Sequence, residues 1–331
     1  MPDEQIVGRF APSPTGPLHF GSLIAAVGSY CLARCEGGRW LLRMEDLDPP
    51  RVVPGAADEI LFALESLGLH WDGEVVWQSR RSDAYAAAMD SLRVRGLIFD
   101  CACTRREIQL QRSLIGEEGP PPGKEGLAFA EEGPVYPGTC RFGLPVGRKP
   151  RTLRIRVPEE QVCFTDGVFG SLGQLLSRDV GDFVLRRADG LFAYQLAVVV
   201  DDAESGVNQV VRGADLLSST PRQIFLNANL GTAVQEYIHL PLVVDENGKK
   251  LSKQQGAAGI DFSRNAGGLM SEALSFLGQE LPAELLGAPP GEQLLWAIHD
   301  FDLKKISASS SSQSVNNSPN NREKIKKPID R

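Results

Sequence analysis

Strand-like and helix-like segments alternate along the first hundred residues, and this alternation restricts the folds that the chain can adopt. Apolar runs predict strands at residues 6–10, 40–44 and 97–99, and helical spacing of apolar side chains predicts helices at residues 21–34, 56–67 and 83–95. Because parallel strands are usually joined by a crossover helix, the pattern predicts an α/β fold with a parallel sheet covered on both faces.

The second half of the chain continues the pattern. Strands are expected at residues 152–157, 183–187, 196–200 and 239–244, and a helix is expected at residues 216–230. The run at 196–200 ends in Asp201 and Asp202. Since open parallel sheets bind ligands at the carboxyl ends of their strands, these two carboxylates are expected near a ligand site.

Composition suggests how the chain is divided. Residues 101–150 contain the loop-like stretch GEEGPPPGKEG, and the last residues are Ser- and Asn-rich and then basic, which predicts a disordered tail. We expect the first half of a core domain at residues 1–100, an insertion at 101–190, the second half of the core at 191–255, a short helical region at 256–305 and the tail at 306–331.

The charge balance limits the partners of the protein. The 331 residues carry a formal net charge of -7, which argues against non-specific coating of nucleic acid, although an acidic protein can still present one basic face. No apolar run reaches the roughly 18 residues of a membrane span. The N-terminus also lacks the basic start and apolar core of a signal peptide. We therefore expect a cytoplasmic protein that does not bind membranes. A monomer is expected as well, although none of these features indicates the oligomeric state.

The segment RFAPSPTGPLHFGS, residues 9–22, joins the first expected strand to the first helix. Its prolines hold the turn in a fixed course. His19 stands at the start of the helix, where backbone N–H groups and the helix dipole favour a phosphate group, and its imidazole could stabilise charge during phosphoryl transfer. A rigid turn with an exposed histidine explains the segment equally well, and the P-loop pattern is missing.

The segment KLSKQ, residues 250–254, follows the strand expected at 239–244. Its lysines, Lys250 and Lys253, flank Ser252 in a loop. A lysine is a mobile charge that can follow phosphate oxygens through a reaction, so Lys253 suits the pentavalent α-phosphate and the leaving pyrophosphate. Taken alone, such a segment is more typical of a solvated basic loop.

Together, the two segments resemble those of the glutamyl-type class I aminoacyl-tRNA synthetases. PLHFGS stands where that family has its His-Ile-Gly-His motif, and KLSKQ stands where it has Lys-Met-Ser-Lys-Ser. The segments RFAPSPTG, RMEDLDPPR, YQLAVVVDD and VVRGADLL extend the similarity from residue 7 to residue 255. The chain departs from the motif at Ser22, where the second histidine would be.

The resemblance implies a Rossmann-like parallel sheet and the activation of L-glutamate with ATP, which is accompanied by Mg²⁺. It implies that His19 and Lys253 are catalytic. The residues that it implies for ATP binding are His19, Gly21, Ser22, Lys250, Ser252 and Lys253.

A site for glutamate needs cations for two carboxylates and an acid for one ammonium group. The residues that the resemblance implies for this site are Arg9, Phe10, Ala11, Pro12, Ser13, Glu45, Tyr194 and Arg212. Arg9 or Arg212 would pair with a carboxylate through two hydrogen bonds, and Glu45 would bind the ammonium group. An amide cannot accept both bonds of such a fork, so the site would favour glutamate over glutamine. Taken singly, Arg212 and Glu45 are more typical of ordinary salt bridges.

Cysteines in the expected insertion favour a metal site. Cys101, Cys103 and Cys140 lie in a loop-rich region with little core of its own, where a structural zinc ion would contribute folding energy. The shorter glutamyl-type paralogues bind zinc here through three cysteines and a tyrosine, a pattern that Tyr136 matches. The alternative is three reduced cysteines without a ligand. The other cysteines are interpreted as small core residues, and they are Cys31, Cys35 and Cys163.

The length after KLSKQ bears on the acceptor. Fewer than eighty residues follow the motif, which is too few for an anticodon-binding module. This shortness and the insertion resemble the glutamyl-queuosine tRNA(Asp) synthetases, which activate glutamate without tRNA and esterify it to the queuosine base in the anticodon loop of tRNA(Asp). The alternatives are a short glutamyl-tRNA synthetase that charges the 3′ end, a non-catalytic paralogue and a nucleotidylyltransferase of similar topology.

Overall fold

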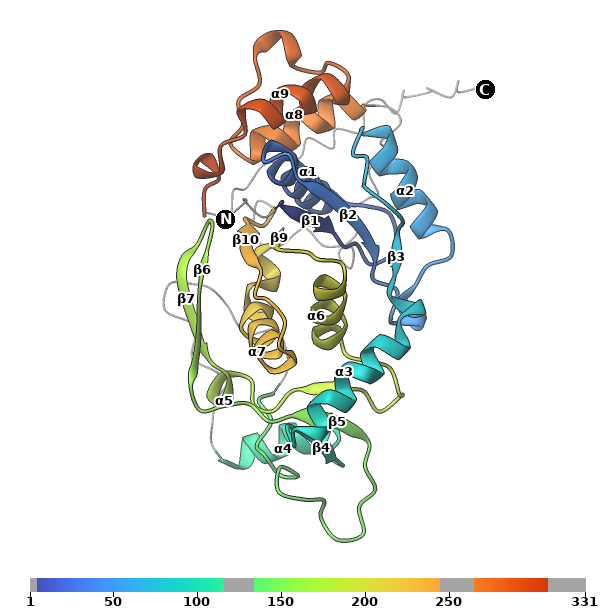
Figure 1. Ribbon diagram of the computed structural model, residues 1–331, viewed down its shortest axis with the longest axis vertical. Coiled ribbons are helices and arrows are strands. Elements are labelled where there is room, and N and C mark those ends of the chain that lie inside the picture. The colour runs from blue at the N-terminus through green and yellow to red at the C-terminus, as the bar shows by residue number, and fades with distance from the viewer. Residues whose placement is uncertain (1–4, 116–133, 245–264, 309–331) are drawn as a thin grey trace, which may run out of the picture.

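The structure is a computed structural model that describes residues 5–115, 134–244 and 265–308 (Figure 1). Its first sheet is parallel, has the order β1-β2-β3, and consists of β1 (Val7–Phe10), β2 (Arg39–Met44) and β3 (Val76–Trp77). Its second sheet has the order β7-β6-β10-β9, with β6 (Gln161–Asp166), β7 (Gly170–Leu175), β9 (Gln209–Gly213) and β10 (Glu236–Leu240). In this sheet β10 pairs in parallel with both β9 and β6, whereas β7 is antiparallel.

The two sheets adjoin at β1 and β9. The backbone N–H of Asn208, which precedes β9, donates to the carbonyl oxygen of Val7 at 3.1 Å, and Asn208 Oδ1 accepts from the Val7 N–H at 2.8 Å. Strands β1, β2, β9 and β10 therefore lie side by side. This arrangement confirms the predicted α/β fold with parallel strand pairing.

Helices cover these sheets and form a large part of the core. They are α1 (Phe20–Cys35), α2 (Ala56–Ser66), α3 (Ser82–Val94), α6 (Tyr194–Glu204), α7 (Thr220–Leu230), α8 (Ala266–Phe276) and α9 (Pro290–Asp300). Figure 1 shows α8 and α9 beside α1 at one end of the molecule. The rings of Phe20 and Phe276 meet edge to face there, with centroids 6.4 Å apart. The expected short helical C-terminal part is therefore present.

The opposite end of the molecule is a small antiparallel sheet with the order β4-β5-β8 (Figure 1). It consists of β4 (Ile98–Cys101), β5 (Thr152–Ile155) and β8 (Val184–Arg186), and the helices nearby in the chain are α4 (Arg105–Ile115) and α5 (Leu176–Asp179). The strand expected at 97–99 exists, but it does not belong to the parallel sheets. The division at residue 190 is crossed by pairing, because β6 of the expected insertion pairs with β10.

The strand predicted at residues 196–200 is wrong, because these residues lie inside α6. Every residue of that run is buried, so no polar face revealed the helical period in the sequence. Asp201 and Asp202 are therefore not at a strand end. They lie in the last turns of α6, where they are buried and pair with arginines.

The hairpin of β6 and β7 was not predicted, and the core position expected for Cys163 is wrong. Cys163 is exposed on β6, whereas Cys31 is buried and Cys35 is half-buried. A strand places alternate side chains on opposite faces, and Cys163 is on the outer face of this hairpin.

The turn from α1 to β2 passes unusually close to neighbouring backbone. A Cβ atom at Gly38 would lie 2.4 Å from the carbonyl oxygen of Ile6 and 2.7 Å from that of Ala33. The next N–H, that of Arg39, donates to the same Ile6 oxygen at 2.8 Å. Glycine at position 38 therefore allows β2 to begin in register with β1.

Short 3-10 turns connect these elements at Pro49–Arg51, Gln78–Arg80, Ala214–Ser219, Ala283–Leu285 and Leu303–Lys305. The sequence predicts a disordered tail at residues 306–331. Residues 309–331 of this tail lie outside the described ranges. Within the described ranges, none of the helices combines the length and the apolar character needed to cross a membrane.

Candidate active site

One cavity of about 310 Å³ brings together the residues that the sequence suggested for glutamate and ATP. It lies where β1, β9 and β10 end and where α1 and α6 begin. The predicted residues that line it are Arg9, Phe10, Ala11, Pro12, Ser13, His19, Gly21, Ser22, Glu45, Tyr194 and Arg212. The KLSKQ segment, with Lys250, Ser252 and Lys253, lies outside the described residues.

His19 is the N-cap residue of α1, as the sequence predicts. Its Nδ1 atom accepts a hydrogen bond from the backbone N–H of Ser22 at 3.2 Å, and its carbonyl oxygen accepts from Ser22 and Leu23. A neutral imidazole that accepts at Nδ1 carries its proton on Nε2. This edge of the cavity therefore combines an imidazole with the positive end of a helix dipole, which is an arrangement suited to phosphate.

Buried ion pairs surround Arg9. Arg43 Nη1 lies 2.5 Å from Asp202 Oδ1, and Arg9 Nε lies 3.4 Å from the same oxygen. Burial alone would raise the pKa of Asp202, but the charges of Arg43 and Arg9 hold it below its usual value. Asp202 is therefore an anion that fixes two arginine side chains from different strands.

Glu45 follows β2 and lies against the turn after β1. Its N–H donates to the carbonyl oxygen of Pro12 at 2.9 Å, and its Oε1 accepts from Arg43 Nη2 at 3.2 Å. Burial raises the pKa of Glu45, and the opposing charge of Arg43 does not fully offset this effect. A ligand ammonium group beside Glu45 would supply further positive charge and favour the carboxylate form.

Tyr194 is the first residue of α6 and lines the same cavity. Burial and the negative charge of Glu45 raise the pKa of Tyr194 to about 12. The phenol is therefore neutral near pH 7, and its hydroxyl group can donate a hydrogen bond to a ligand oxygen.

Arg212 on β9 is held by several protein acceptors. Its Nε donates to His239 Nε2 at 3.1 Å and its Nη1 to Gln223 Oε1 at 2.8 Å, while Nη2 donates to Thr220 Oγ1 at 2.8 Å and to the Leu216 carbonyl oxygen at 3.4 Å. These bonds involve four of the five guanidinium N–H groups. Sequence reasoning missed all four partners, because no motif marks them.

Arg9 makes fewer hydrogen bonds to protein acceptors than Arg212 does. Apart from its contact with Asp202, it donates through Nη1 to the carbonyl oxygen of Val211 at 3.2 Å. Among the described residues, no hydrogen bond to its Nη2 is present, so Nη1 and Nη2 together can still offer two parallel N–H groups. This geometry favours Arg9 over Arg212 for a two-bond contact with a carboxylate.

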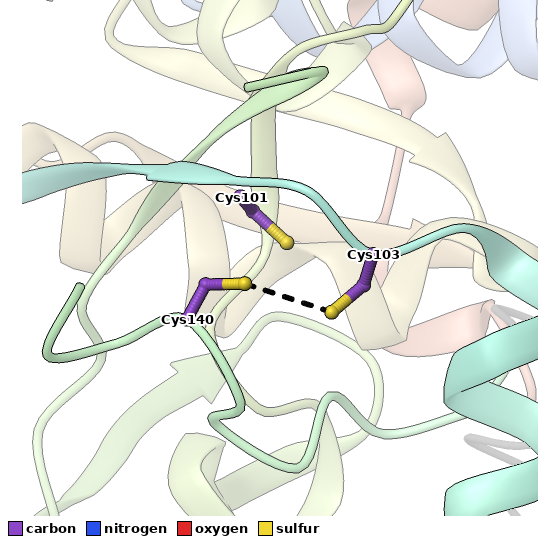
Figure 2. A group of neighbouring side chains, drawn as sticks. All are labelled: Cys101, Cys103 and Cys140. Atoms are coloured by element: carbon purple, nitrogen blue, oxygen red, sulfur yellow. Dashed lines mark hydrogen bonds between the residues drawn. The ribbon is translucent and has the colours of Figure 1, made fainter. Parts of the chain in front are cut away.

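Cys101, Cys103 and Cys140 gather in one cluster, as Figure 2 shows, with all three sulfur atoms within 4.8 Å of one another. The Sγ atoms of Cys103 and Cys140 are 3.7 Å apart, and the Tyr136 hydroxyl lies 3.5 Å from Cys101 Sγ. Tetrahedral zinc with Zn–S bonds of about 2.3 Å requires ligand atoms separated by roughly 3.5 to 3.8 Å. The three cysteine sulfur atoms could therefore hold a zinc ion, and the Tyr136 hydroxyl group lies beside one of them.

The electrostatics of this cluster favour a thiolate at Cys101. Burial would raise its pKa, but hydrogen bonds that include those from Tyr136 and Arg154 lower the pKa of Cys101 to about 7. The guanidinium of Arg154 also lies over the Tyr136 ring, 4.0 Å from its centroid. Burial raises the pKa of Cys103 to about 12 in the absence of a cation, so metal binding there would release a proton.

A second cavity, of about 770 Å³, lies between the antiparallel sheet and helices α6 and α7. It approaches the first cavity at the start of α6, because Ala193 and Gln195 line the second cavity and Tyr194 lines the first. The arginines that line it are Arg51, Arg105, Arg151, Arg154, Arg187 and Arg222. They are dispersed along the chain, so no local sequence pattern predicted their convergence.

The chain matches known proteins along most of its length. Residues 5–279 match the family model "tRNA synthetases class I (E and Q), catalytic domain". The chain is 53% identical over 310 residues to a Glutamyl-Q tRNA(Asp) synthetase of Geobacter sulfurreducens, covering 92% of this chain and 95% of the relative. It is 54% identical over 290 residues to one of Dechloromonas aromatica, covering 88% and 92%.

Solved structures give the same fold. The glutamate-tRNA synthetase of Elizabethkingia anophelis superposes with a TM-score of 0.75 at 26% identity, over 94% of this chain and 68% of that one. A glutamate tRNA ligase from Elizabethkingia meningosepticum, in complex with its amino acid, gives a TM-score of 0.75 at 25% identity, over 93% and 67%. The resemblance inferred from the motifs is confirmed, and the chain belongs to the glutamyl-Q tRNA(Asp) synthetase family of the class I tRNA synthetases.

Proposed function

We propose that this protein activates L-glutamate with ATP, without tRNA, and transfers the glutamate to the queuosine base in the anticodon loop of tRNA(Asp). The observation that carries the proposal is the convergence of Arg9, Glu45, Tyr194 and Arg212 in one cavity, beside His19 at the start of α1. The cavity thus offers cations for carboxylates, an acid for an ammonium group and a helix start for phosphate.

In the first step, an oxygen of the glutamate α-carboxylate attacks the α-phosphorus of ATP, and the bond to pyrophosphate breaks. Arg9 holds a carboxylate through its free fork, and Glu45 holds the ammonium group. Mg²⁺ that accompanies ATP would neutralise phosphate charge. His19 contacts the phosphate, and we assign Lys253, which lies outside the described residues, to the charge that develops on the transferring group. The products are glutamyl adenylate and pyrophosphate.

In the second step, a hydroxyl oxygen of the queuosine cyclopentenediol attacks the carbonyl carbon of the adenylate. The bond to AMP breaks, AMP leaves, and the hydroxyl proton is lost to solvent. The arginine-lined cavity supports a nucleic-acid acceptor, because its guanidinium groups suit phosphate oxygens and it reaches the start of α6 next to Tyr194. A group of arginines in one cavity is compatible with the net charge of -7 of the whole chain.

We also propose one structural zinc ion per chain, held by Cys101, Cys103, Cys140 and Tyr136. The separations of the sulfur atoms and of the Tyr136 hydroxyl support this assignment. Because the cluster includes few other buried apolar residues, the ion would contribute to the folding of this end of the molecule rather than to the reaction. The expected domain limits, a monomeric state and a cytoplasmic location stay predictions from the sequence.

The acceptor is tested with two tRNA pools, one from cells that make queuosine and one from cells that cannot. The protein is incubated with ATP and labelled glutamate, and the label retained on RNA is counted. Label on the queuosine-containing pool alone is expected. Equal label on both pools would assign 3′-end charging instead, and no label with intact glutamate-dependent pyrophosphate exchange would retain the activation step but refute the acceptor.

A further inference from the structure

A row of buried side chains connects the β6–β7 hairpin to the glutamate cavity. Asp166, the last residue of β6, has its Oδ2 atom 2.6 Å from Nδ1 of His239 on β10. The other ring nitrogen of His239, Nε2, lies 3.1 Å from Nε of Arg212, which lines the cavity. The side chains of Asp166 and His239 are both 0% exposed, so water does not compete for these contacts.

The chemistry of the guanidinium group fixes the direction of its hydrogen bond to His239, and Thr220 Oγ1, which lies 3.2 Å from the same Nε2 atom, can then donate to it as well. A guanidinium Nε can only donate, so Nε2 of His239 must accept. A neutral imidazole then carries its proton on Nδ1 and donates it to Asp166. Burial lowers the pKa of His239 to about 4, and the charge of Arg212 also lowers it, whereas the hydrogen bond to Asp166 and the charge of Asp166 raise it. The ring is therefore neutral near pH 7.

Asp166 is itself held in place by backbone groups. Its Oδ1 atom accepts from the N–H groups of Val168 and Phe169, each at 3.0 Å, and its Oδ2 atom accepts from the backbone N–H of His239 at 3.1 Å. Burial alone would raise the pKa of Asp166, but the hydrogen bond and charge of His239 and these backbone donors keep it below its usual value. The carboxylate is thus a fixed anion that defines which nitrogen of His239 carries the proton.

We propose that Asp166 and His239 are positioning residues that set the affinity for the amino acid, because they present an acceptor to Arg212 and hold its guanidinium group in the glutamate cavity. This inference rests on the proposed function. Neither residue touches the cavity itself, and both act through Arg212. The hairpin that carries Asp166 belongs to the expected insertion, so a residue remote in sequence determines the geometry of the amino-acid site.

The substitution Asp166→Asn tests the direction of these bonds. The amide oxygen of the new side chain can still accept from Val168 and Phe169, but its NH₂ group then faces Nδ1 of His239. The imidazole would shift its proton to Nε2 and present a donor to the Arg212 Nε–H. Two opposed donors in a buried site are unfavourable, so the KM for glutamate in pyrophosphate exchange should rise at least about tenfold. The KM for ATP should change by less than about twofold.

Two variants of His239 separate its contact with Asp166 from its contact with Arg212. They also distinguish a loss of positioning from a general folding defect. In His239→Asn, the amide NH₂ group reaches about as far as Nδ1 and can still donate to Asp166, but the Nε–H of Arg212 loses its acceptor, while the bonds from its Nη atoms are kept. In His239→Gln, the amide oxygen reaches about as far as Nε2 and can still accept from Arg212. The inference predicts a rise in the KM for glutamate for His239→Asn and a KM closer to that of the parent protein for His239→Gln. Asp90→Asn, a change at an exposed residue of α3, is the matched control.

The tautomer of His239 can be measured without any reaction, through the ¹⁵N chemical shifts of its ring nitrogens. The expected result is an Nδ1–H tautomer in the parent protein and an Nε2–H tautomer in Asp166→Asn. An Nε2–H tautomer or an imidazolium in the parent would overturn the inference, as would a shifted tautomer with an unchanged KM for glutamate. If the parent protein does not activate glutamate at all, the proposed function fails, while the ring measurement still decides whether the hydrogen-bond order is right.

Discussion

Arg43 Nη1 and Asp202 Oδ1 lie 2.5 Å apart, and this buried ion pair joins β2 to α6 beside the glutamate cavity. The same carboxylate also contacts Arg9, so one anion neutralises two buried cations. Replacing Asp202 by Ala would leave both arginines without that partner. We expect a loss of about 3 to 5 kcal/mol in the free energy of unfolding, measured by urea denaturation.

The exposed residue Asp90 offers a control for that substitution. Its ion pair with Arg93 is at the surface, so Asp90→Ala should change the free energy of unfolding by less than about 1 kcal/mol. A similarly small loss for Asp202→Ala would show that the buried pair contributes little and that solvent enters when it is removed.

Arg9→Lys tests the fork assigned to the α- or side-chain carboxylate of glutamate. A lysine keeps the positive charge but cannot present two parallel N–H groups. The KM for glutamate should rise roughly tenfold, and the preference for glutamate over glutamine should fall, since that preference depends on bidentate pairing. Pyrophosphate exchange with each amino acid measures both effects. Arg93→Lys, at an exposed residue of α3, should leave the KM for glutamate and the selectivity unchanged. If Arg9→Lys keeps the selectivity of the parent protein, another residue makes the two-bond contact with the carboxylate.

Lys253→Ala tests the second motif. Removing a mobile charge from the transferring phosphate should lower the rate of pyrophosphate exchange at least tenfold, which corresponds to about 1.4 kcal/mol of transition-state stabilisation. The matched control is Lys304→Ala, a change in the short turn at Leu303–Lys305, remote from the motif in sequence. Unchanged exchange kinetics in Lys253→Ala would remove this lysine from the mechanism.

The zinc proposal predicts a measurable stoichiometry. Atomic absorption should find one zinc ion per chain, and Cys103→Ser should lose it, whereas the exposed Cys163→Ser should retain it. Tyr136→Phe distinguishes a ligand from a neighbour, because loss of a ligand should weaken zinc binding by about tenfold or more. A zinc-loaded Tyr136→Phe variant with unchanged affinity would restrict the site to the three cysteines.

His239 predicts how stability depends on pH. In an unfolded chain the pKa of a histidine is about 6.5, whereas burial lowers the pKa of His239 to about 4 in the folded protein. Between these values the unfolded chain binds more protons, so the free energy of unfolding should fall as the pH drops from about 6.5 to about 4, by roughly 3 kcal/mol. Urea denaturation at several pH values in this window measures the slope. His239→Asn should flatten it, and an identical slope would assign the effect to other groups.

The part of the site that could be predicted from sequence is the part encoded by contiguous residues. The turn and helix of residues 9–22 form a local unit, so the position of His19 at the start of α1 followed from the order of prolines, glycines and apolar residues. Glu45, which follows β2, and Arg212 on β9 were located through motifs in segments far apart in the sequence. The structure brings these segments to one cavity, as parallel pairing requires.

The rest depends on contacts between distant segments. The apolar run of α6 could be interpreted as a strand because burial on every side removes the helical period. Asp166 and His239 are 73 positions apart in sequence and meet only because β6 pairs with β10, a pairing that no local pattern indicates. The six arginines of the second cavity also come from segments that are far apart in the sequence, so no local pattern indicates that they converge.

The close backbone contact at Gly38 has a consequence for variation at this position. Any side chain at position 38 would clash with two carbonyl oxygens. One belongs to Ile6, just before β1, and the other to Ala33, in the last turn of α1. The displacement would reach the strand that carries Arg9 and the helix that begins at His19. Saturation mutagenesis followed by selection for the modified tRNA should therefore recover glycine almost alone at codon 38, although Gly38 does not line the glutamate cavity.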